Sequence, residues 1–380
     1  MLFQTTQAHE ELRAKIRAFA EEEVKPIAFS LDQANEFPAD AVKKLGEMGL
    51  MGIPYPKEYG GAGLDAISYA IAVEELSRVD GGTGVILSAH VSLGSWPIFA
   101  FGTEEQKQKY LVPLAKGEKL GAFGLTEPNA GTDASGQQTT AVLEGDHYVL
   151  NGSKCFITNG TVASTIVVFA MTDPKAGNHG ISAFIVESSF PGFSVGKKEK
   201  KMGIRGSSTC DLIFEDCIVP KENLLGKEGQ GFKIAMQTLD GGRIGIAAQA
   251  LGLGEGAIDE AVKYTQERVQ FKKRLSQFQN TQFQLADMHT RMQAAQYLVY
   301  AAACKKENHE PYSVDAAMAK LFAAEAASDV TRRAVQLFGG YGYTREYPVE
   351  RMMRDAKITE IYEGTSEVQR MVISRAMGVK

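Results

Sequence analysis

Residues 139–160 read TTAVLEGDHYVLNGSKCFITNG and belong to a β-rich zone that lies between two helical ones. Short runs of β-branched and aromatic residues are separated here by two tight-turn signals, Gly145-Asp146 and Asn151-Gly152. Similar runs follow at STIVVFAM (164–171), GISAFIVES (180–188) and CDLIFED (210–216). Several short strands at this spacing predict a small antiparallel β-sandwich or barrel over residues 122–226.

The sequence before this zone is helical in character. AISYAIAVEELSRVDGG (66–82) carries apolar residues at helical spacing, and we expect this helix to end at Gly81-Gly82. Residues 1–121 are therefore predicted to form an N-terminal helical domain.

The sequence after the β-rich zone, residues 227–380, predicts a four-helix bundle. One apolar face steps by three or four residues through Leu285, Met288, Met292, Ala295, Val299 and Ala302, and a second through Val314, Ala317, Met318, Leu321 and Phe322. We expect Ser313 to cap the second helix and Gly339-Gly340 to end it. Helices, then a sheet, then helices place the chain in the α+β class.

Composition excludes several classes of protein. The 380 residues are 44% hydrophobic and 23% charged, with a net charge of −5, which gives no basic surface for nucleic acid. No run resembles a membrane span, and the first residues predict an amphipathic helix, not a signal peptide. The four cysteines are scattered, with no CxxC and no HExxH, so we expect no metal site and a reduced, cytoplasmic protein.

The usual cofactor loops are missing from the sequence. There is no GxGxxG after a strand, no GxxxxGK[ST] and no GxSxG. GKEGQG (226–231) is rich in glycine but follows no βα pattern, so we interpret it as a hinge into the helical bundle.

A single carboxylate stands at a helix junction in ITEIYEGTSEVQR (358–370). Gly364 can end one helix, and Thr365 or Ser366 can cap the next, with Ser366 and Gln369 fitting a capping box. Glu363 would then lie beside a helix N-terminus, which favours anions. The pattern allows either a catalytic base or a solvated loop residue.

Two further stretches are open to two interpretations each. FGLTEPNAGTDASG (123–136) is either a hydrogen-bonding loop built on Thr126, Gly131 and Thr132 or an ordinary turn between domains. In LDGGRIG (239–245) two adjacent glycines cost a helix roughly 2 kcal/mol relative to alanine. They either permit close approach of a ligand or another backbone, with Arg243 holding a polar or anionic group, or form a helix-start loop with a solvated arginine.

At these motifs the sequence resembles the acyl-CoA dehydrogenase family over essentially its whole length. The resemblance is carried, in order, by LTEPNAGTDASG, LNGSKCFITNG, LDGGRIGIAAQALG, QLFGGYGY and RDAKITEIYEGTSE. The nearest likeness is to the short-chain, or butyryl-CoA, dehydrogenases. It implies the same three domains, FAD as cofactor, a homotetramer built as a dimer of dimers, and a place in fatty acid β-oxidation.

The resemblance also implies the reaction, which is oxidation of an acyl-CoA to the trans-2-enoyl-CoA with electrons passed to electron-transfer flavoprotein. No side chain accepts a hydride, so a cofactor must, and flavin fits better than NAD in a chain without a dinucleotide fingerprint. Glu363 matches the family base that removes the α-proton while the flavin N5 takes the β-hydride. The backbone N–H of the base and a flavin ribityl hydroxyl would stabilise the thioester oxygen.

Other site residues are carried over from the family motifs one by one. The stretches that would lie along the flavin ring contribute Phe123, Leu125, Thr126, Gly131, Thr132, Phe156, Ile157 and Thr158. The rest of FAD would be bound by Arg268, Gln270, Phe271, Gln279, Gln336, Leu337, Phe338, Gly339, Gly340, Thr365, Ser366 and Glu367, some of them from a neighbouring subunit. The matching substrate contacts are Thr132, Asp240, Arg243 and Gly364.

The sequence departs from the family pattern at Lys272 and Arg274, where relatives commonly have glycine and proline, and we expect both side chains to face solvent. One family branch takes its base from the helix that carries LDGGR, but Gly241 and Gly242 leave no carboxylate there. The first alternative to a dehydrogenase of unbranched short-chain acyl-CoA is a branched short-chain acyl-CoA dehydrogenase. The others are an acyl-CoA oxidase and a non-catalytic acyl-CoA or flavin-binding scaffold.

Overall fold

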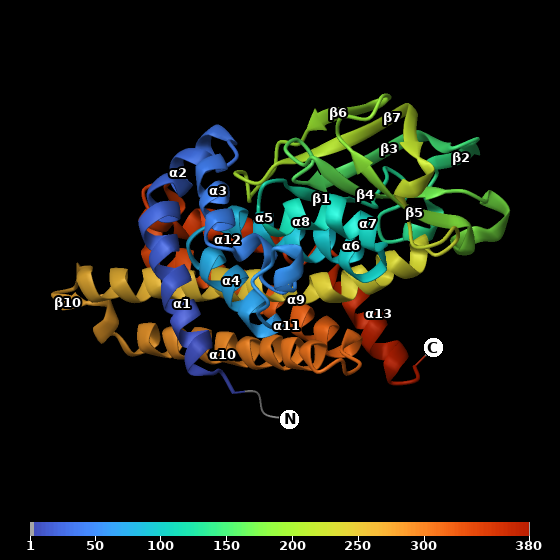
Figure 1. Cartoon of the computed structure of the whole chain (residues 1–380). Coiled ribbons are helices and arrows are strands. Elements are labelled where there is room, and N and C mark those ends of the chain that lie inside the picture. Colours follow the sequence, from blue (N-terminus) through green and yellow to red (C-terminus); the bar gives the residue numbers. More distant parts are fainter. Residues whose placement is uncertain (1–3, 380) are drawn as a thin grey trace.

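The computed structural model describes residues 4–379, which form a block of helices, a β-sheet and a second block of helices in chain order. Figure 1 shows the sheet lying against the first helical block, with the long helices of the second block running beneath both. The predicted α+β architecture is confirmed.

The first block contains eight α-helices within the described residues. They are α1 (Gln7–Phe19), α2 (Lys25–Ala34), α3 (Ala39–Glu47), α4 (Ala66–Val79), α5 (Gly81–Ala89), α6 (Trp96–Phe101), α7 (Glu104–Gln106) and α8 (Val112–Ala115). The expected end of α4 at Gly81-Gly82 is wrong. Asp80 separates the two helices, because its Oδ2 accepts the Thr83 N–H at 2.7 Å and so caps α5, which the two glycines begin.

One continuous helical stretch of the first block, Gly81–Phe101, is long and apolar enough to resemble a membrane span, so the expectation that no run does so is wrong. It includes a π-helical segment, His90–Ser95, between α5 and α6. Since 78% of its most apolar window is buried inside the protein, the stretch is a core helix here.

The β-sheet has eight strands: β1 (Gly121–Gly124), β2 (Thr140–Glu144), β3 (His147–Thr158), β4 (Thr165–Met171), β5 (Ile181–Glu187), β6 (Phe193–Lys198), β7 (Thr209–Pro220) and β8 (Leu224–Leu225). The order is β6-β7-β3-β2-β4-β5-β8, mostly antiparallel, and β1 pairs in parallel with β4. The predicted strands at 164–171, 180–188 and 210–216 are confirmed.

The two turn signals of the opening stretch differ in the structure. Gly145-Asp146 joins β2 to β3 as expected, whereas Asn151-Gly152 lies inside β3. The pairing of β3 with β7 shifts register between Leu150 and Gly152, and Gly152 has φ +142°. The Asn-Gly pair therefore makes a bulge, not a hairpin turn.

Strand β4 joins the sheet to the helices because both of its faces are buried. Ile166 and Val168 pack into the core of the β-domain, whereas Val167 and Phe169 pack into the larger helical core. The alternation of side chains along a strand explains why its sequence, TIVVFAM, is apolar throughout.

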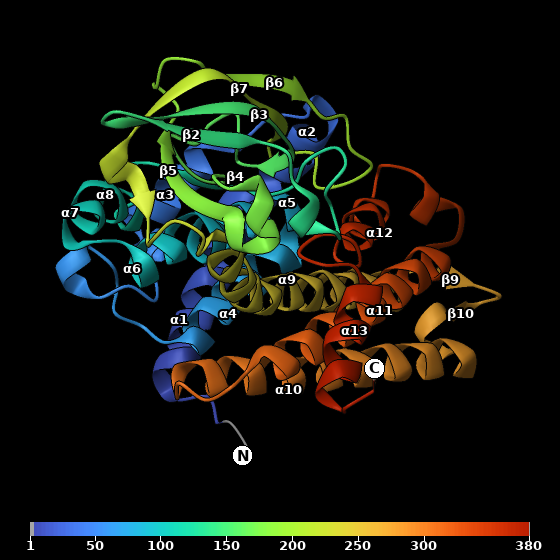
Figure 2. The same cartoon turned by 90° about the vertical axis from the view of Figure 1, so that its right-hand side faces the viewer.

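The second helical block consists of α9 (Gly231–Glu267), α10 (Gln279–Glu307), α11 (Ser313–Phe338), α12 (Val349–Ile358) and α13 (Ser366–Ala376). A small hairpin, β9 (Val269–Gln270) with β10 (Lys273–Arg274), joins α9 to α10. In Figures 1 and 2 this hairpin projects from the ends of the long helices, away from the sheet.

The expected apolar face of α10 is confirmed, since Met288, Met292, Ala295, Val299 and Ala302 are fully buried.

The expected face of α11 is only partly right: Ala317 is fully buried, but Phe322 is not. Phe322 is 36% exposed, whereas the neighbouring Lys320 is 0% exposed, because the alanine-rich side of the helix faces the core. The expected cap is also wrong. Ser313 is the first residue of α11, and its hydroxyl donates to Asp240 Oδ1 at 2.9 Å. The expected end of the helix at Gly339 is confirmed, with φ +62°.

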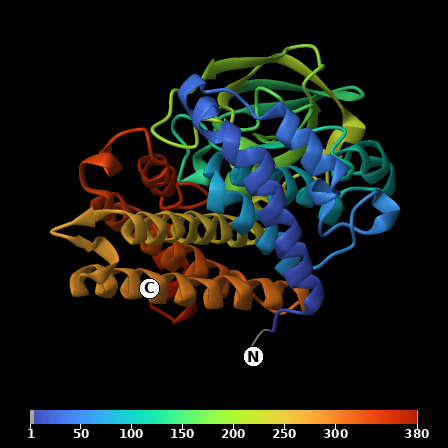
Figure 3. The ribbon, with the colours of Figure 1, turned by 90° about the vertical axis from the view of Figure 1, so that its left-hand side faces the viewer.

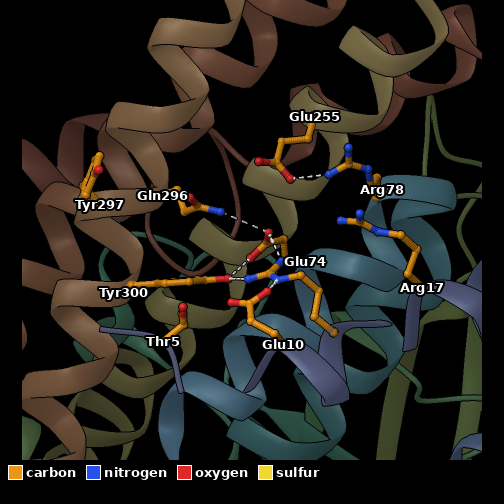
Figure 4. A pocket seen from close by; sticks show the side chains of 10 residues that line it. Thr5, Glu10, Arg17, Glu74, Arg78, Glu255, Gln296, Tyr297 and Tyr300 are labelled. Atoms are coloured by element: carbon orange, nitrogen blue, oxygen red, sulfur yellow. Dashed lines mark hydrogen bonds and ion pairs between the residues drawn. The ribbon is translucent and has the colours of Figure 1, made fainter. Parts of the chain in front are cut away.

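A buried ionic cluster ties α1 to α4 and α10, and it surrounds a pocket of about 290 Å³ (Figure 4). Arg13 contacts Glu74 at 2.7 Å and Glu75 at 2.6 Å, and both glutamates are fully buried. Tyr300 of α10 donates to Glu74 Oε2 at 2.5 Å. Figure 3 shows α1, in blue, crossing the ends of the long helices at this point.

Candidate active site

Glu363 lies in the short connection between α12 and α13, with its backbone in the left-handed region at φ +52°. Gly364 follows with φ +92°, and Thr365 caps α13 by accepting the Val368 N–H at 3.3 Å. The expected capping box of Ser366 with Gln369 is wrong. With Thr365 as the N-cap, the Gln369 amide donates to the carbonyl oxygens of Glu363 and Gly364 instead.

The carboxylate of Glu363 is buried and has an open oxygen. Within residues 4–379, Oε2 of Glu363 has no hydrogen-bond partner. Burial raises the pKa of Glu363 from 4.5 to about 7, while the cations of Lys320 and Arg243 pull it down. A buried carboxylate that titrates near neutrality, with one oxygen uncommitted, is suited to take up a proton.

The side chain of Glu363 points at helix α9, at the position of Gly242. A Cβ placed on Gly242 would lie 2.0 Å from Glu363 Oε2 and 3.0 Å from Leu93 Cδ2. Gly241-Gly242 are inside the helix, so the helix-start interpretation is wrong. The space beside Gly242 is taken by the side chain of Glu363, and approach of a ligand to these glycines stays a prediction. The glycine allows the carboxylate to lie directly against the helix backbone.

Arg243 follows on the same helix and is also buried, with 6% of its surface exposed. Its Nη1 donates to Asp240 Oδ1 at 2.5 Å, and Asp240 is in turn held by Ser313. Among the described residues, Nε of Arg243 has no hydrogen-bond partner. The solvated-arginine interpretation is therefore wrong, and a donor remains available beside the Glu363 carboxylate.

The two stretches expected along a flavin ring lie side by side in the structure. Cys155 N–H donates to Thr126 O at 2.9 Å, which joins the end of β3 to the loop after β1. Phe123 packs against the helical core, Leu125 and Ile157 are buried, Thr126 and Thr158 are half-buried, and Gly131 and Thr132 are exposed. Phe156 stands out with 63% of its surface exposed and φ +60°.

A separate pocket of about 450 Å³ lies at the far end of the long helices. Of the expected residues, Arg268, Gln270, Gln336, Leu337, Phe338, Gly339 and Gly340 line it. Phe271, 90% exposed, and Gln279, at the start of α10, are close in sequence but outside this lining. Lys272 and Arg274 have exposed side chains, as expected, and Lys272 adopts φ +63° at the hairpin turn.

One chain does not bring these two regions together. The strands that carry Phe123 and Phe156 lie in the sheet, and the hairpin beside Arg268 projects away from it (Figures 1 and 2). Thr365, Ser366 and Glu367 form the start of α13, near Glu363.

Both regions fit parts of an FAD molecule. An exposed phenylalanine in a left-handed conformation, beside a loop of hydroxyl residues, offers a face for a flat ring. At the other region, a Cβ placed on Gly339 or Gly340 would meet no heavy atom within 4 Å, which leaves room for a ligand against the backbone. Arg268 is a cation that suits a pyrophosphate.

Sequence reasoning missed Lys320 and Leu93 of this site and gave Gln369 only a capping role. Lys320 Nζ donates to Gly364 O at 2.7 Å, next to the carboxylate. A lysine within the run AAMAKLFAA, flanked by alanines on a core-facing helix, is a signal that could have identified it. The position of Leu93 depends on the π-helical segment His90–Ser95.

Comparisons with known proteins show which family the chain belongs to. Three family models match consecutive parts of the chain: the acyl-CoA dehydrogenase N-terminal domain over residues 6–118, the middle domain over 122–217 and the C-terminal domain over 229–378. The short-chain specific acyl-CoA dehydrogenase of Clostridium acetobutylicum is 66% identical over 374 residues, which are 98% of this chain and 99% of that protein.

Two solved structures are similar over their full length. Butyryl-CoA dehydrogenase from Megasphaera elsdenii has a TM-score of 0.97 at 55% identity, covering 99% of this chain and 100% of that one. A chain solved under the description of the electron transferring flavoprotein of Acidaminococcus fermentans has a TM-score of 0.98 at 61% identity, covering 99% of both. The chain belongs to the acyl-CoA dehydrogenase family.

Proposed function

We propose that the protein catalyses α,β-dehydrogenation of a short-chain acyl-CoA to the trans-2-enoyl-CoA, with Glu363 as the base that removes the α-proton. The observation that carries this proposal is the buried, uncommitted Oε2 of Glu363. The short-chain assignment is supported by the Clostridium acetobutylicum and Megasphaera elsdenii relatives.

Acyl-CoA dehydrogenases are FAD flavoproteins, and the bound flavin supplies the acceptor for the two electrons of the reaction. We assign its ring to the surface formed by Phe123, Leu125, Thr126, Gly131, Thr132, Phe156, Ile157, Thr158 and the start of α13 from Thr365 to Glu367. We assign its pyrophosphate and adenosine end to Arg268, Gln270, Phe271, Gln279 and residues 336–340.

The base is prepared for proton transfer by its surroundings. A pKa of about 7 means that a large fraction of Glu363 is ionised at neutral pH, yet its carboxylate is far more basic than an ordinary one. Exclusion of water by the acyl chain would strengthen this effect further.

Charge that develops on the thioester oxygen needs a donor. Among residues 4–379, the amide N–H of Glu363 donates no hydrogen bond, so it is free to bind that oxygen. Thr132, Arg243 and Gly364 would hold the rest of the substrate, with Asp240 fixing the guanidinium of Arg243.

Two kinds of partner belong to this activity: other copies of the chain and a protein that accepts the electrons. The two groups of FAD-binding residues lie at separate places on one chain, which a homotetramer would bring together across subunits. Phe271 and Tyr343, each 90% exposed beside the hairpin and the glycine turn, support burial against another copy of the chain. We infer electron-transfer flavoprotein as the acceptor, since the Acidaminococcus fermentans chain comes from such a system.

We also propose that the protein is cytoplasmic, with domains at 1–121, 122–226 and 227–380. Four free cysteines support the location, and the order of helices and strands supports the domain bounds.

The test is an anaerobic titration of the FAD-loaded protein with butyryl-, isobutyryl-, 2-methylbutyryl- and octanoyl-CoA, following bleaching of the flavin spectrum. We expect butyryl-CoA to bleach the wild type, and Glu363→Gln to bind FAD and ligand without bleaching. Normal bleaching by this variant would falsify the base assignment, and a wild type that binds acyl-CoA but never bleaches would favour the scaffold alternative.

A further inference from the structure

The backbone that carries the base is held by a group of side chains to which the family motifs assign no role. Glu363 and Gly364 both adopt positive φ, +52° and +92°. Positive φ is ordinary for glycine but unfavourable for glutamate, so the turn persists only if surrounding contacts over-determine it. Those contacts must also place the carboxylate within reach of the substrate.

The carbonyl of Gly364 is the point at which the turn is fixed. It accepts hydrogen bonds from Lys320 Nζ at 2.7 Å and from Gln369 Nε2 at 2.9 Å, which occupies both of its lone pairs. The same Gln369 nitrogen also donates to Glu363 O at 3.3 Å. Lys320 comes from α11 and Gln369 from α13, so side chains of two helices bind the same turn.

Both side chains are completely buried, with 0% of their surface exposed. A buried lysine is costly unless its charge is compensated, and burial lowers the pKa of Lys320 to about 8. Among the neighbouring charges, the carboxylate of Glu363 favours the ammonium form most strongly. Conversely, Lys320 is the stronger of two cations that act on Glu363. Each charge therefore stabilises the other, although Lys320 donates its hydrogen bond to the Gly364 carbonyl and not to the carboxylate.

We propose that Lys320 and Gln369 are positioning residues for the base: both fix the left-handed Glu363-Gly364 turn through the Gly364 carbonyl, and Lys320 in addition supplies a buried positive charge beside the carboxylate. This inference rests on the proposed function only in that it names Glu363 as the base.

Other charged and titratable groups face the same place and must be kept constant in a test. Arg243 of α9 also lowers the pKa of Glu363. Burial and the charge of Glu363 both raise the pKa values of Tyr69 of α4 and Tyr362. The charges of Glu360 and Glu367 favour the ammonium form of Lys320. The variants below leave all of them intact.

The charge is tested by the pH dependence of kcat/KM for butyryl-CoA. We expect Lys320→Met to move the acidic limb up by about one pH unit, since loss of a neighbouring cation raises the carboxylate pKa. Lys320→Arg should restore the limb. Lys320→Gln, which can still donate a hydrogen bond but carries no charge, should show the same shift as Lys320→Met and serves if that variant does not fold.

A matched control is Lys201→Met. Lys201 also has a lowered pKa of about 8 through burial and donates to a backbone carbonyl, Ser207 O at 2.8 Å, but it does not act on Glu363. The acidic limb of the kcat/KM profile of Lys201→Met should stay where it is in the wild type. An unshifted limb in both Lys320→Met and Lys320→Gln would overturn the charge role.

The positioning role is tested with Gln369→Leu. We expect kcat to fall about tenfold, with KM and the acidic limb unchanged, because the carboxylate keeps its charge environment but loses its alignment. A variant with reduced thermal stability and unchanged kcat would overturn this part.

A measurement without turnover separates this inference from the proposed function. The difference in Tm between the wild type and Glu363→Gln develops as the pH rises above the unfolded-state pKa of Glu363, and it reaches a plateau once Glu363 is ionised in the folded protein as well. In a Lys320→Met background that difference should reach its plateau about one pH unit higher. If butyryl-CoA is not oxidised at all, the proposed function fails while this result still supports or overturns the role of Lys320.

Discussion

Glu363 occupies the space that a side chain on Gly242 would fill, since a Cβ on that glycine would lie 2.0 Å from Oε2 of the glutamate. The two residues are far apart in sequence and come from a helix junction and the middle of α9. The close approach explains why α9 accepts a glycine pair in its interior despite the cost in helix propensity. It also seals one side of the carboxylate from water.

Gly242→Ala is therefore expected to displace the base. The new Cβ would lie 2.0 Å from the carboxylate oxygen, so the carboxylate has to move. A displacement of about 1 Å costs roughly 100-fold in kcat. Steady-state kinetics with butyryl-CoA measure the loss. Gly241→Ala is the matched control, because its Cβ would be 3.2 Å from the flexible end of Lys306, and kcat should change only slightly. Equal kcat values in the two variants would contradict the role of Gly242.

Tyr69 is expected to limit the length of the acyl chain. Gly245 lies one helical turn beyond Gly242 on α9, and a Cβ there would be 2.3 Å from both the Tyr69 hydroxyl and Ser88 Oγ. The Tyr69 hydroxyl therefore lies against α9 one turn beyond the glycine that faces the base, and we expect it to bound the space for the acyl chain. Tyr69→Ala should raise kcat/KM for hexanoyl-CoA relative to butyryl-CoA roughly tenfold, and Tyr69→Phe, which keeps the ring, should leave the ratio near wild type. A ratio that stays constant in Tyr69→Ala counts against this prediction.

Glu363→Gln should stabilise the protein, and more so as the pH rises. The folded pKa of about 7 lies above the ordinary 4.5, so the neutral form contributes stability that is complete below pH 4.5 and is lost as the pH rises to 7. The amide stays neutral throughout and avoids that loss, which amounts to at most about 3 kcal/mol. Melting of the FAD-loaded proteins at about pH 5.5 and about pH 8 should show the larger gap at the higher pH. A gap that is constant with pH would mean that Glu363 titrates normally.

Phe156→Ala should weaken FAD binding about tenfold with little loss of stability, because the ring is 63% exposed and has few protein contacts to lose. Equilibrium dialysis gives the affinity, and melting of the FAD-free protein gives the stability. Ile157→Ala is the contrast, since Ile157 is 3% exposed and its truncation should cost about 2–5 kcal/mol. Unchanged FAD affinity in Phe156→Ala would remove this residue from the proposed flavin surface.

Arg13→Met should destabilise the protein by about 3–5 kcal/mol, because it leaves the buried carboxylate of Glu74 without its cation. Denaturant unfolding followed by circular dichroism measures the change. Lys43→Ala provides the comparison, since Lys43 pairs with Glu47 at 3.9 Å on an exposed surface and should contribute less than about 0.5 kcal/mol. A loss of stability in Arg13→Met as small as that in Lys43→Ala would show that the ionic cluster in Figure 4 does not stabilise the fold.

Local patterns in the sequence determined the succession of elements. The β-prone runs at 164–171, 180–188 and 210–216 became strands because each is a short run of β-branched and aromatic residues between turn or break residues. The face of α10 was predictable because its apolar residues recur at helical spacing. The face of α11 was not, because Lys320 faces the core and Phe322 does not, and only the partners of a helix decide which side is buried.

The chemistry divides in the same way. The sequence identified Glu363 as a candidate base and offered the two glycines of α9 as one possible place of close approach, and the family resemblance assigned the stretches around Thr126 and Phe156 to the flavin ring. Only the tertiary structure brought Glu363 against Gly242 and placed Lys320 and Gln369 on the Gly364 carbonyl. The physical reason is that a carboxylate's pKa depends on burial and on charges from distant helices, which no local pattern of residues encodes.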